Sequence, residues 1–347
     1  MKKLLRRKKQ TDQQPARITN ETVAEHRERI LAGGRRFKYP VQYARHRLVI
    51  NTIVISFIAL ILLVGVVWWQ LYLAQNSSTF FYRITRAVPL PVASVDGQSV
   101  LYSDYLVGYR SHAHYLEFKE GVNLNSKENK TRVDYIKREA LNDAVADAYA
   151  AKLAHQYNVA ITEEQVDAAI TRQRHSRDGV ASVETYNAII LDHFDWTPEE
   201  ARGVTARKLL RQEVSYKVDD KAGKQRDKLV ELLKTQPDFD KIATELGGTG
   251  TAKVTTGITQ LVPRNNQDGG LAAVAADLKK GELSQVFKST NGDGYYIVRL
   301  IESDAKGQVS YAFIKIPLTV FKERLEKIHA EGKVDEYVEV PTVKKQL

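Results

Sequence analysis

Few residues in this sequence have the type and spacing that catalysis or metal binding requires. The 347 residues include no cysteine, which excludes disulfides, thiol catalysis and thiolate zinc sites. Neither the G-x-S-x-G turn of serine hydrolases nor the H-E-x-x-H helix of zinc peptidases occurs. His112-x-His114 is a suggestive pair, but two-residue spacing on a predicted helix makes the rings diverge, so we interpret both as solvated. The sequence therefore predicts no metal site and no cofactor.

Tyrosine residues point to a different function, the binding of a polypeptide chain. The sequence holds 17 tyrosines against 10 phenylalanines. Tyr105 and Tyr109 share a face of a predicted helix at i,i+4, and Tyr115 follows them. A tyrosine ring is rigid and amphipathic, so it contacts a flexible chain at little cost in entropy. We predict that these three tyrosines bind unfolded chains, with ordinary packing in the core as the alternative.

The region that carries these tyrosines, residues 92–218, is expected to be mainly helical after a hairpin. The hairpin is predicted around Asp96-Gly97, a strong two-residue turn signal. Capping residues and apolar positions at helical spacing mark the helices. The expected helices are 103–118 capped by Ser103, 131–157, one opened by Thr162-x-x-Gln165, 183–194, and one opened by Thr197-Pro198 that runs to Tyr216.

The following region changes to a small α+β pattern. Helices are expected at 222–233, 239–246 and 271–278, and strands at 283–287 and 295–302. The Asn291-Gly292-Asp293-Gly294 turn joins those two strands. A further strand at 309–316 and an amphipathic helix with Val320, Phe321, Leu325 and Ile328 complete the segment 304–347.

An apolar stretch near the N-terminus, residues 48–73, has no charged residue and is long enough to span a membrane, for which roughly 20 apolar residues suffice. The basic residues of 1–47 account for the whole net charge of +10, so the remainder is neutral and nucleic acid is not an expected partner. Basic residues favour the cytoplasmic side and aromatic rings the interface. We therefore predict a cytoplasmic tail at 1–47, one transmembrane helix, a linker at 74–91 and an extracytoplasmic C-terminal part. The expected membrane-interface residues are Arg45, Arg47, Trp68, Trp69 and Tyr72.

Several motifs in order resemble the membrane-anchored or periplasmic foldases of the SurA/PrsA/PpiD type. In the first region these are Val92-Ala93-Ser94-Val95-Asp96-Gly97 with Ser103-Asp104-Tyr105, and the helix from Ala140 followed by Glu164-Gln165-Val166. In the second they are Asp238-Phe239-Asp240-Lys241-Ile242-Ala243, Lys280-Gly281-Glu282-Leu283-Ser284 and Gly294-Tyr295-Tyr296-Ile297-Val298. The resemblance implies a helical chaperone domain at 92–218 and a parvulin-like peptidyl-prolyl isomerase domain at 223–303.

The same resemblance implies an incomplete catalytic set. Parvulins carry a histidine in a first R-H-I-L strand and another in the last strand, but no such strand precedes Ala222, and Tyr296 stands at the second position. The candidate proline pocket is Leu261, Val262, Leu271, Phe287 and Tyr296. The absent strand leaves a gap in the sheet. Residues 309–316 either fill that gap or add an edge strand.

The function expected from these patterns is a membrane-anchored extracytoplasmic chaperone or foldase whose isomerase activity is weak or lost. Its partners would be newly exported polypeptides and the lipid bilayer, while the sequence sets no oligomeric state. A working isomerase with an unusual pocket and a non-catalytic envelope scaffold are the alternatives.

Overall fold

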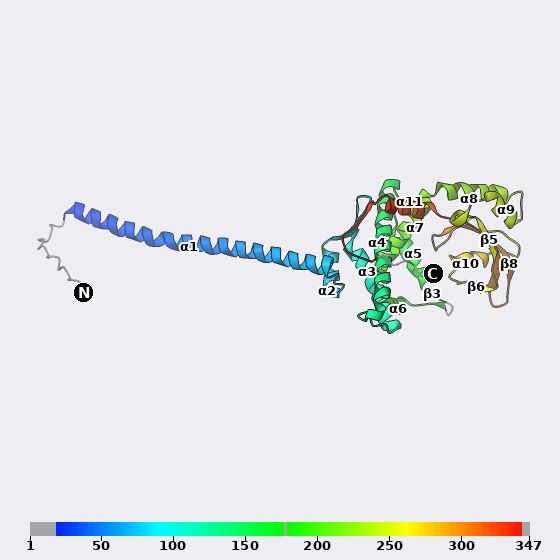
Figure 1. The fold of residues 1–347 in the computed structure, drawn as a ribbon, viewed down its shortest axis with the longest axis horizontal. Helices are drawn as coiled ribbons and strands as arrows, with labels where there is room; N and C mark the ends of the chain where they lie inside the picture. The colour runs from blue at the N-terminus through cyan, green and yellow to red at the C-terminus, as the bar shows by residue number, and fades with distance from the viewer. Residues whose placement is uncertain (1–18, 177–178, 342–347) are drawn as a thin grey trace. The chain divides into compact units, whose positions relative to one another are not determined.

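The computed structural model describes residues 19–176 and 179–341, and divides the chain into two units at residues 69 and 70. The first unit contains helix α1 (Asn20–Trp68), drawn in blue in Figure 1. A short π-helical segment, Trp69–Leu73, follows. Residues 46–73 are helical, long and apolar enough to cross a membrane, and the most apolar window of 18 residues within them has no buried residue. Residues 1–18 of the predicted tail, and the side chain of Arg45, lie outside the described part.

The second unit, which starts at Gln70, contains a helical module that we define as residues 70–218 and 319–341. Helices α3 and α7 both pack on the long helix α4. The elements of residues 70–218 are α2 (Thr79–Ala87), β1 (Pro91–Val95), β2 (Gln98–Leu101), α3 (Tyr102–His114), the π-helical segment Tyr115–Lys119, the 3₁₀ turn Lys127–Asn129, α4 (Lys130–Tyr157), α5 (Glu163–Gln173), β3 (His175–Ser176), β4 (Gly179–Val180), α6 (Val183–Phe194) and α7 (Pro198–Val218).

Local signals in the sequence locate most of these helices correctly. Thr162 and Thr197 each form the predicted capping box, and Pro198 is the first residue of α7. Ser103 is the exception, because α3 begins at Tyr102 with Leu101 as its N-cap residue. Ser103 therefore lies inside the first turn and does not cap the helix.

The predicted linker, residues 74–91, is wrong because it contains helix α2. The side chains of Tyr82 and Thr85 are buried, and the Tyr82 hydroxyl donates a 2.7 Å hydrogen bond to Glu200 Oε1 on α7. The Arg110 guanidinium lies 5.1 Å from the centre of the Tyr82 ring. The segment thus packs on the helical module.

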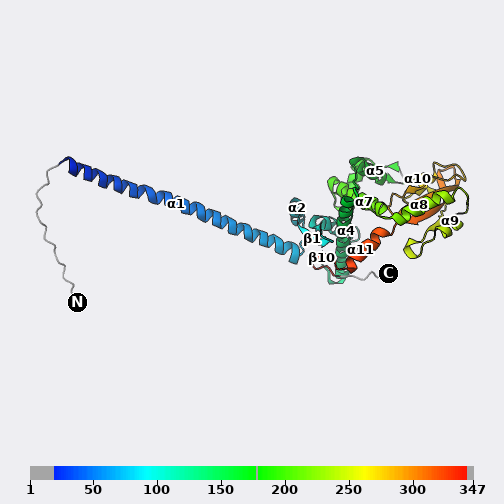
Figure 2. The ribbon, with the colours of Figure 1, turned by 90° about the horizontal axis from the view of Figure 1, so that it is seen from above.

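The remaining part of the second unit is a sheet domain, which we define as residues 219–318. Its sheet has the order β5-β9-β8-β7, with β6 also paired to β9. Figure 2 shows the chain from a second side. The elements are α8 (Asp220–Leu232), α9 (Phe239–Leu246), the 3₁₀ turn Gly250–Ala252, β5 (Thr255–Ile258), β6 (Val262–Pro263), α10 (Leu271–Ala275), β7 (Phe287–Lys288), β8 (Gly294–Ser303) and β9 (Gln308–Pro317).

Strand β9 occupies a central position in this sheet. It pairs with β8 from Gly294↔Pro317 to Ser303↔Val309 and with β5 on its other side. The hypothesis that residues 309–316 fill the gap is therefore confirmed, and the edge-strand alternative is wrong. The domain consequently extends beyond residue 303 to the end of β9.

Each face of the sheet has its own apolar core. Tyr295 and Ile297 face α8 and α9, while the alternate residues Tyr296, Val298 and Leu300 face α10. Helix α10 ends at Ala275, three residues earlier than expected, and the strand expected at 283–287 is reduced to the bridge Leu283↔Arg299 and the short β7.

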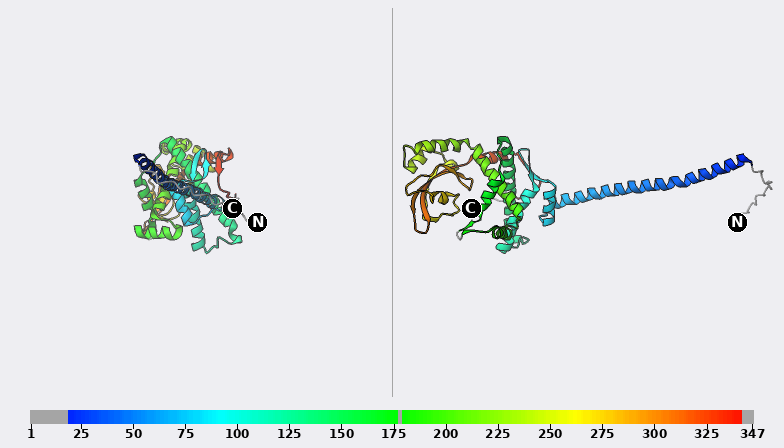
Figure 3. Two further views of the ribbon diagram at one scale, coloured as in Figure 1. Left: turned by 90° about the vertical axis from the view of Figure 1, so that its left-hand side faces the viewer. Right: turned by 180° about the vertical axis from the view of Figure 1, so that it is seen from behind.

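The C-terminal segment returns to the helical module. Helix α11 (Val320–Ala330) contacts α7, and strand β10 (Val334–Glu336) adds to the β1–β2 hairpin in the order β10-β1-β2. In Figure 3 this red segment lies beside the cyan hairpin. Residues 304–347 are therefore not a separate appendage, because β9 belongs to the sheet domain and α11 and β10 belong to the helical module.

Candidate functional site

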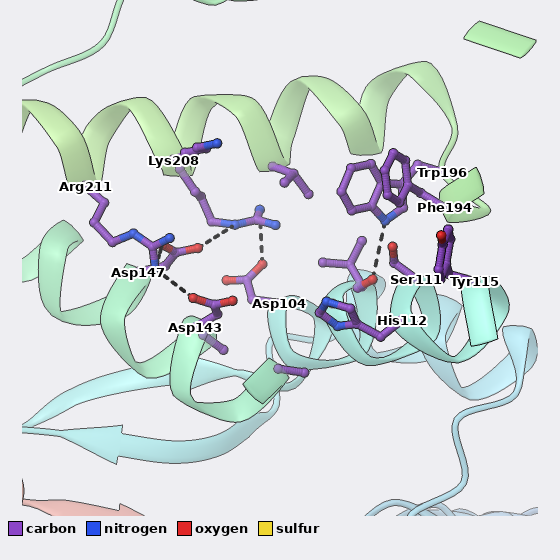
Figure 4. Close-up of a pocket in the computed structure, with 16 residues that line it drawn as sticks. Asp104, Ser111, His112, Tyr115, Asp143, Asp147, Phe194, Trp196, Lys208 and Arg211 are labelled. Atoms are coloured by element: carbon purple, nitrogen blue, oxygen red, sulfur yellow. Dashed lines mark hydrogen bonds and ion pairs between the residues drawn. The ribbon is translucent and has the colours of Figure 1, made fainter. Parts of the chain in front are cut away.

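A cavity of about 490 Å³ lies in the helical module between α3, α4 and α7 (Figure 4). The small side chains of Gly108, Ala140 and Ala144 line it and leave room for a guest. At one end, the rings of Phe194 and Trp196 stack with 4.8 Å between their centres. Trp196 Nε1 donates a 3.4 Å hydrogen bond to the Val107 carbonyl, which ties the indole to α3.

The opposite end of the cavity is a network of charged side chains. Arg207 Nη1 lies 3.2 Å from Asp104 Oδ1, and Arg211 Nη1 lies 3.1 Å from Asp143 Oδ1 and 3.3 Å from Asp147 Oδ1. Burial raises the pKa of Asp104 and of Asp147, and the neighbouring arginines only partly offset it. The cavity is therefore divided into an aromatic end and a charged end (Figure 4).

Between these ends, His112 presents an unsatisfied polar atom. Its Nδ1 is buried and has no hydrogen-bond partner within residues 19–176 and 179–341. Buried polar atoms in proteins normally have a partner. The ring of His112 lines the cavity, but this nitrogen is closed off from it, so a guest does not reach it in this conformation. His114 lies apart from it, stacked on Phe118 with ring centres 4.6 Å apart.

An exposed apolar surface adjoins the aromatic end of the cavity. We call it the α6 rim and define it as Phe118, Leu191 and Phe194. Their exposed fractions are 70%, 54% and 37%. Lys119 pairs with Asp192, and this contact holds the segment after α3 against α6. The rim therefore extends an apolar surface from the cavity to the outside of the module.

The three predicted client-binding tyrosines have different surroundings. Tyr105 and Tyr109 are 2% and 9% exposed, and their rings stack with centres 6.1 Å apart. Both are core residues, which is the packing alternative that the sequence left open. Tyr115 is 41% exposed and lines the cavity. Of the three, only Tyr115, in the π-helical segment after α3, reaches the cavity, and its binding of unfolded chains stays a prediction.

Sequence reasoning missed Phe194, Trp196 and His112. Phe194 and Trp196 directly precede the capping box that opens α7, so their position next to the start of a helix could be predicted from the sequence. Two aromatic residues just before a predicted helix N-terminus could have been proposed as part of a binding surface. Nothing in the sequence distinguishes His112 from a solvated residue, because its burial depends on how α3 packs.

The predicted proline pocket is a second candidate site, on the α10 side of the sheet. Val262, Leu271, Phe287 and Tyr296 lie in one apolar cluster. Leu271 and Tyr296 are only 4% and 7% exposed, whereas Leu261 is 40% exposed and lies outside that cluster. Four of the five predicted residues are therefore together, but two of them are closed off from solvent.

Tyr296 is held by a polar network at the end of β8. Its hydroxyl donates a 2.8 Å hydrogen bond to Asp293 Oδ2, while Lys315 donates to the same carboxylate and Ser289 Oγ to its other oxygen. Burial acts to raise the pKa of Asp293, but these hydrogen bonds outweigh it and lower the pKa. Burial and then the Asp293 contact raise the pKa of Tyr296. The phenol is therefore a fixed, neutral donor at neutral pH.

Strand β9 places a second ring beside Tyr296. The centres of the Tyr296 and Phe313 rings are 6.0 Å apart, and Phe313 stands directly across from Val298 in the sheet. Gly257 makes room for this ring, because a Cβ there would lie 2.6 Å from Phe313 Cζ. Neither β8 nor β9 contains a histidine. Aromatic rings therefore occupy this face of the sheet.

Comparison with known families assigns both regions. The sequence model of the SurA-like N-terminal domain matches residues 42–215, which is half of the chain. The chain belongs to this SurA-like family. The model of the PPIC-type PPIase domain, a parvulin rotamase, matches residues 204–315. The resemblance found in the sequence is thereby confirmed for both regions. A search of curated protein sequences found no match.

The three aromatic residues predicted at the membrane interface lie at the C-terminal end of the apolar stretch. Trp68 and Trp69 are 56% and 52% exposed. Tyr72 belongs to the second unit, where its hydroxyl donates a 2.7 Å hydrogen bond to the Pro91 carbonyl. Their placement at a bilayer, with that of Arg45 and Arg47, stays a prediction.

Proposed function

We propose that this protein is a membrane-anchored extracytoplasmic foldase that holds newly exported polypeptides in its helical module. A SurA-like chaperone domain joined to a PPIC-type domain indicates a foldase acting on unfolded polypeptides. The observation that carries the proposal is the cavity with an aromatic end and the adjoining α6 rim.

The chemistry of the cavity suits an unfolded chain. Pockets of about 300 to 1,000 Å³ accept small guests, and 490 Å³ accommodates client side chains and a short piece of main chain. Phe194 and Trp196 offer stacking surface, and Tyr115 adds a third ring that lines the cavity. Because these contacts read apolar character rather than one sequence, the site fits many clients.

Anchoring rests on the apolar stretch of residues 46–73. Its exposed apolar side chains would be costly in water, and a bilayer core satisfies them. The basic residues of 1–47 precede it, which favours a cytoplasmic N-terminus. The foldase would then work on the extracytoplasmic side.

Weak or lost isomerase activity follows from the filled α10 side of the sheet. A proline substrate needs an open apolar pocket where its twisted amide is stabilised. Here Leu271 and Tyr296 are buried, and Phe313 and Tyr296 occupy the face without a histidine. The PPIC-type match favours the second candidate function, an active isomerase.

Two assays on the full chain in phosphatidylcholine vesicles separate these functions. Aggregation of a chemically unfolded client should be suppressed, and Leu191→Glu should weaken that suppression several-fold because it places a charge on the α6 rim. Val230→Glu is the matched control, since Val230 is 43% exposed on α8, away from the cavity. Isomerisation of a proline peptide should stay at the uncatalysed rate.

Equal suppression by the Leu191→Glu and Val230→Glu variants would refute the proposed binding surface. Catalysed isomerisation that Tyr296→Ala abolishes would establish the isomerase instead. If the chain neither suppresses aggregation nor catalyses isomerisation, the foldase proposal fails.

A further inference from the structure

The start of the second unit leaves no spacer between the apolar stretch and the folded part. Leu71 is fully buried, and the Tyr102 hydroxyl donates a 2.5 Å hydrogen bond to the Leu71 carbonyl. The backbone then folds back, since Asn76 N donates a 2.8 Å hydrogen bond to the Gln70 carbonyl and Asn76 Nδ2 a 2.9 Å bond to Gln70 Oε1. The chain at residues 70–76 is therefore fixed in the fold.

Helix α2 begins close to this fixed point. Its first residue, Thr79, follows Asn76 by three steps, which span at most about 11 Å. Asn76 is hydrogen-bonded to Gln70, and Gln70 follows the predicted interface residue Trp69 directly. If residues 46–69 span a bilayer, α2 begins at the depth of the lipid headgroups, because that layer is several ångströms thick on each side.

One face of α2 is buried in the module and the opposite face is free. We define the α2 outer face as Phe80, Arg83 and Ala87, which lie at i, i+3 and i+7. All three are exposed, and Phe80 is 67% exposed. Within the described part of the chain, Arg83 forms no ion pair. An exposed ring beside a free cation is the pattern of helices that lie on membranes.

The charged side chains that α2 itself carries are both positive, although Glu200 of α7 packs beside them. No aspartate or glutamate occurs between Glu28 and Asp96, so Arg83 and Arg86 are the only ionisable charges of α2 and its flanks. Arg86 is still half exposed although it pairs with Glu200 at 3.3 Å. Anionic headgroups attract such cations, and a phenylalanine ring inserts at the boundary of the acyl chains.

We propose that the α2 outer face docks on the lipid surface next to the anchor, so that the folded unit rests on the bilayer. This inference rests on the proposed membrane anchor and adds a second contact to it. The occupant is an anionic phospholipid surface, not a client or a second copy. The contact would hold the α6 rim at a constant height above the membrane, where exported chains emerge.

The experiment uses the absence of cysteine from the chain. An environment-sensitive fluorophore is attached to a single cysteine in each of three full-length variants, Phe80→Cys, Leu191→Cys and Ile61→Cys. These sites are all more than half exposed, at 67%, 54% and 54%. Vesicles of phosphatidylglycerol with phosphatidylethanolamine are compared with phosphatidylcholine vesicles. Quenching is measured with lipid-borne and with aqueous quenchers.

The label at position 61 should be quenched by lipid, and the label at position 191 by the aqueous quencher. The label at position 80 should show a lipid-to-aqueous quenching ratio several-fold above that at 191 in the anionic vesicles. Adding Arg83→Glu should lower this ratio several-fold there, and change it little in phosphatidylcholine.

Two results would overturn the inference, and they differ in whether they also refute the membrane anchor. If position 61 is lipid-quenched while position 80 behaves as position 191 does, the anchor stands and the docking of α2 is refuted. If position 61 is not lipid-quenched, the anchor itself is refuted, and the docking of α2 with it.

Discussion

The cavity of the helical module and the α10 side of the sheet are both rich in aromatic rings, yet they are built differently. In the cavity, Phe194 and Trp196 stack on each other beside small residues, and space remains. On the sheet, Tyr296 and Phe313 lie against α10 and occupy the surface themselves. Aromatic content alone therefore does not mark a binding site. What matters is whether the facing helix closes on the rings, as α10 does, or leaves space beside them, as in the cavity.

The largest effect is expected from removing a ring that fills the sheet face. Tyr296→Ala deletes a side chain that is 7% exposed and leaves Asp293 without one donor. Aromatic-to-alanine changes in cores cost about 3–5 kcal/mol. Denaturant unfolding monitored by circular dichroism should show a loss of this size. A loss below about 1 kcal/mol would mean that the face is open, as an active pocket requires.

The junction of the two regions should show the next largest effect. Asp219 is 2% exposed, and its Oδ1 accepts a 2.9 Å hydrogen bond from Ala222 N. Its Oδ2 accepts bonds of 2.8 and 3.2 Å from Thr319 N and Val320 N, where the chain returns. Asp219→Ala should cost about 2–4 kcal/mol, because it removes a helix cap and leaves buried donors unpaired.

The same variant tests whether the two regions unfold together. The chain passes between the helical module and the sheet domain near residue 219 and again near residue 319, and Asp219 bonds to both places. Calorimetric unfolding of Asp219→Ala should therefore separate into two transitions. Asp220→Ala, one residue along and exposed, is the control and should keep the wild-type profile. A single, unshifted transition in Asp219→Ala would contradict this account of the junction.

A smaller, pH-dependent effect is expected at Asp293. Its pKa is lowered in the folded state, so its ionised form stabilises the fold above the unfolded pKa of about 3.9. That contribution is lost as the pH falls through the folded pKa. Its side chain is 39% exposed, so screening limits the cost of Asp293→Asn to about 1–2 kcal/mol at pH 7.

The pH series supplies the control for Asp293. The difference in unfolding free energy between wild type and Asp293→Asn should shrink toward zero as the pH is lowered below the folded pKa. A difference that stays constant with pH would show that folding does not lower the pKa of Asp293.

The smallest effect on stability is expected in the cavity. Tyr115→Ala removes a ring that is 41% exposed, and surface changes usually stay within about 0.5 kcal/mol. Its suppression of client aggregation should nevertheless fall, since the ring lines the cavity. A loss of stability as large as that of Tyr296→Ala would erase the contrast between the two regions.

The positions of elements that have local sequence signals were predictable without the structure. The capping boxes at Thr162 and Thr197 located two helices, Asp96-Gly97 located the hairpin, and residues 183–194 and 239–246 were bounded correctly. Each of these signals depends on residues within one or two turns of chain. The alternation of β9 also indicated its two faces, because side-chain period depends on the strand alone.

Contacts between separate segments could not be predicted from the sequence and became clear from the tertiary fold. It placed β9 in the centre of the sheet, paired β10 with β1, and packed α2 on the helical module where a linker was expected. It also buried Tyr105 and Tyr109 and left Tyr115 at the cavity. These outcomes depend on which other strands and helices a segment meets in the fold, and no local spacing in the sequence specifies that.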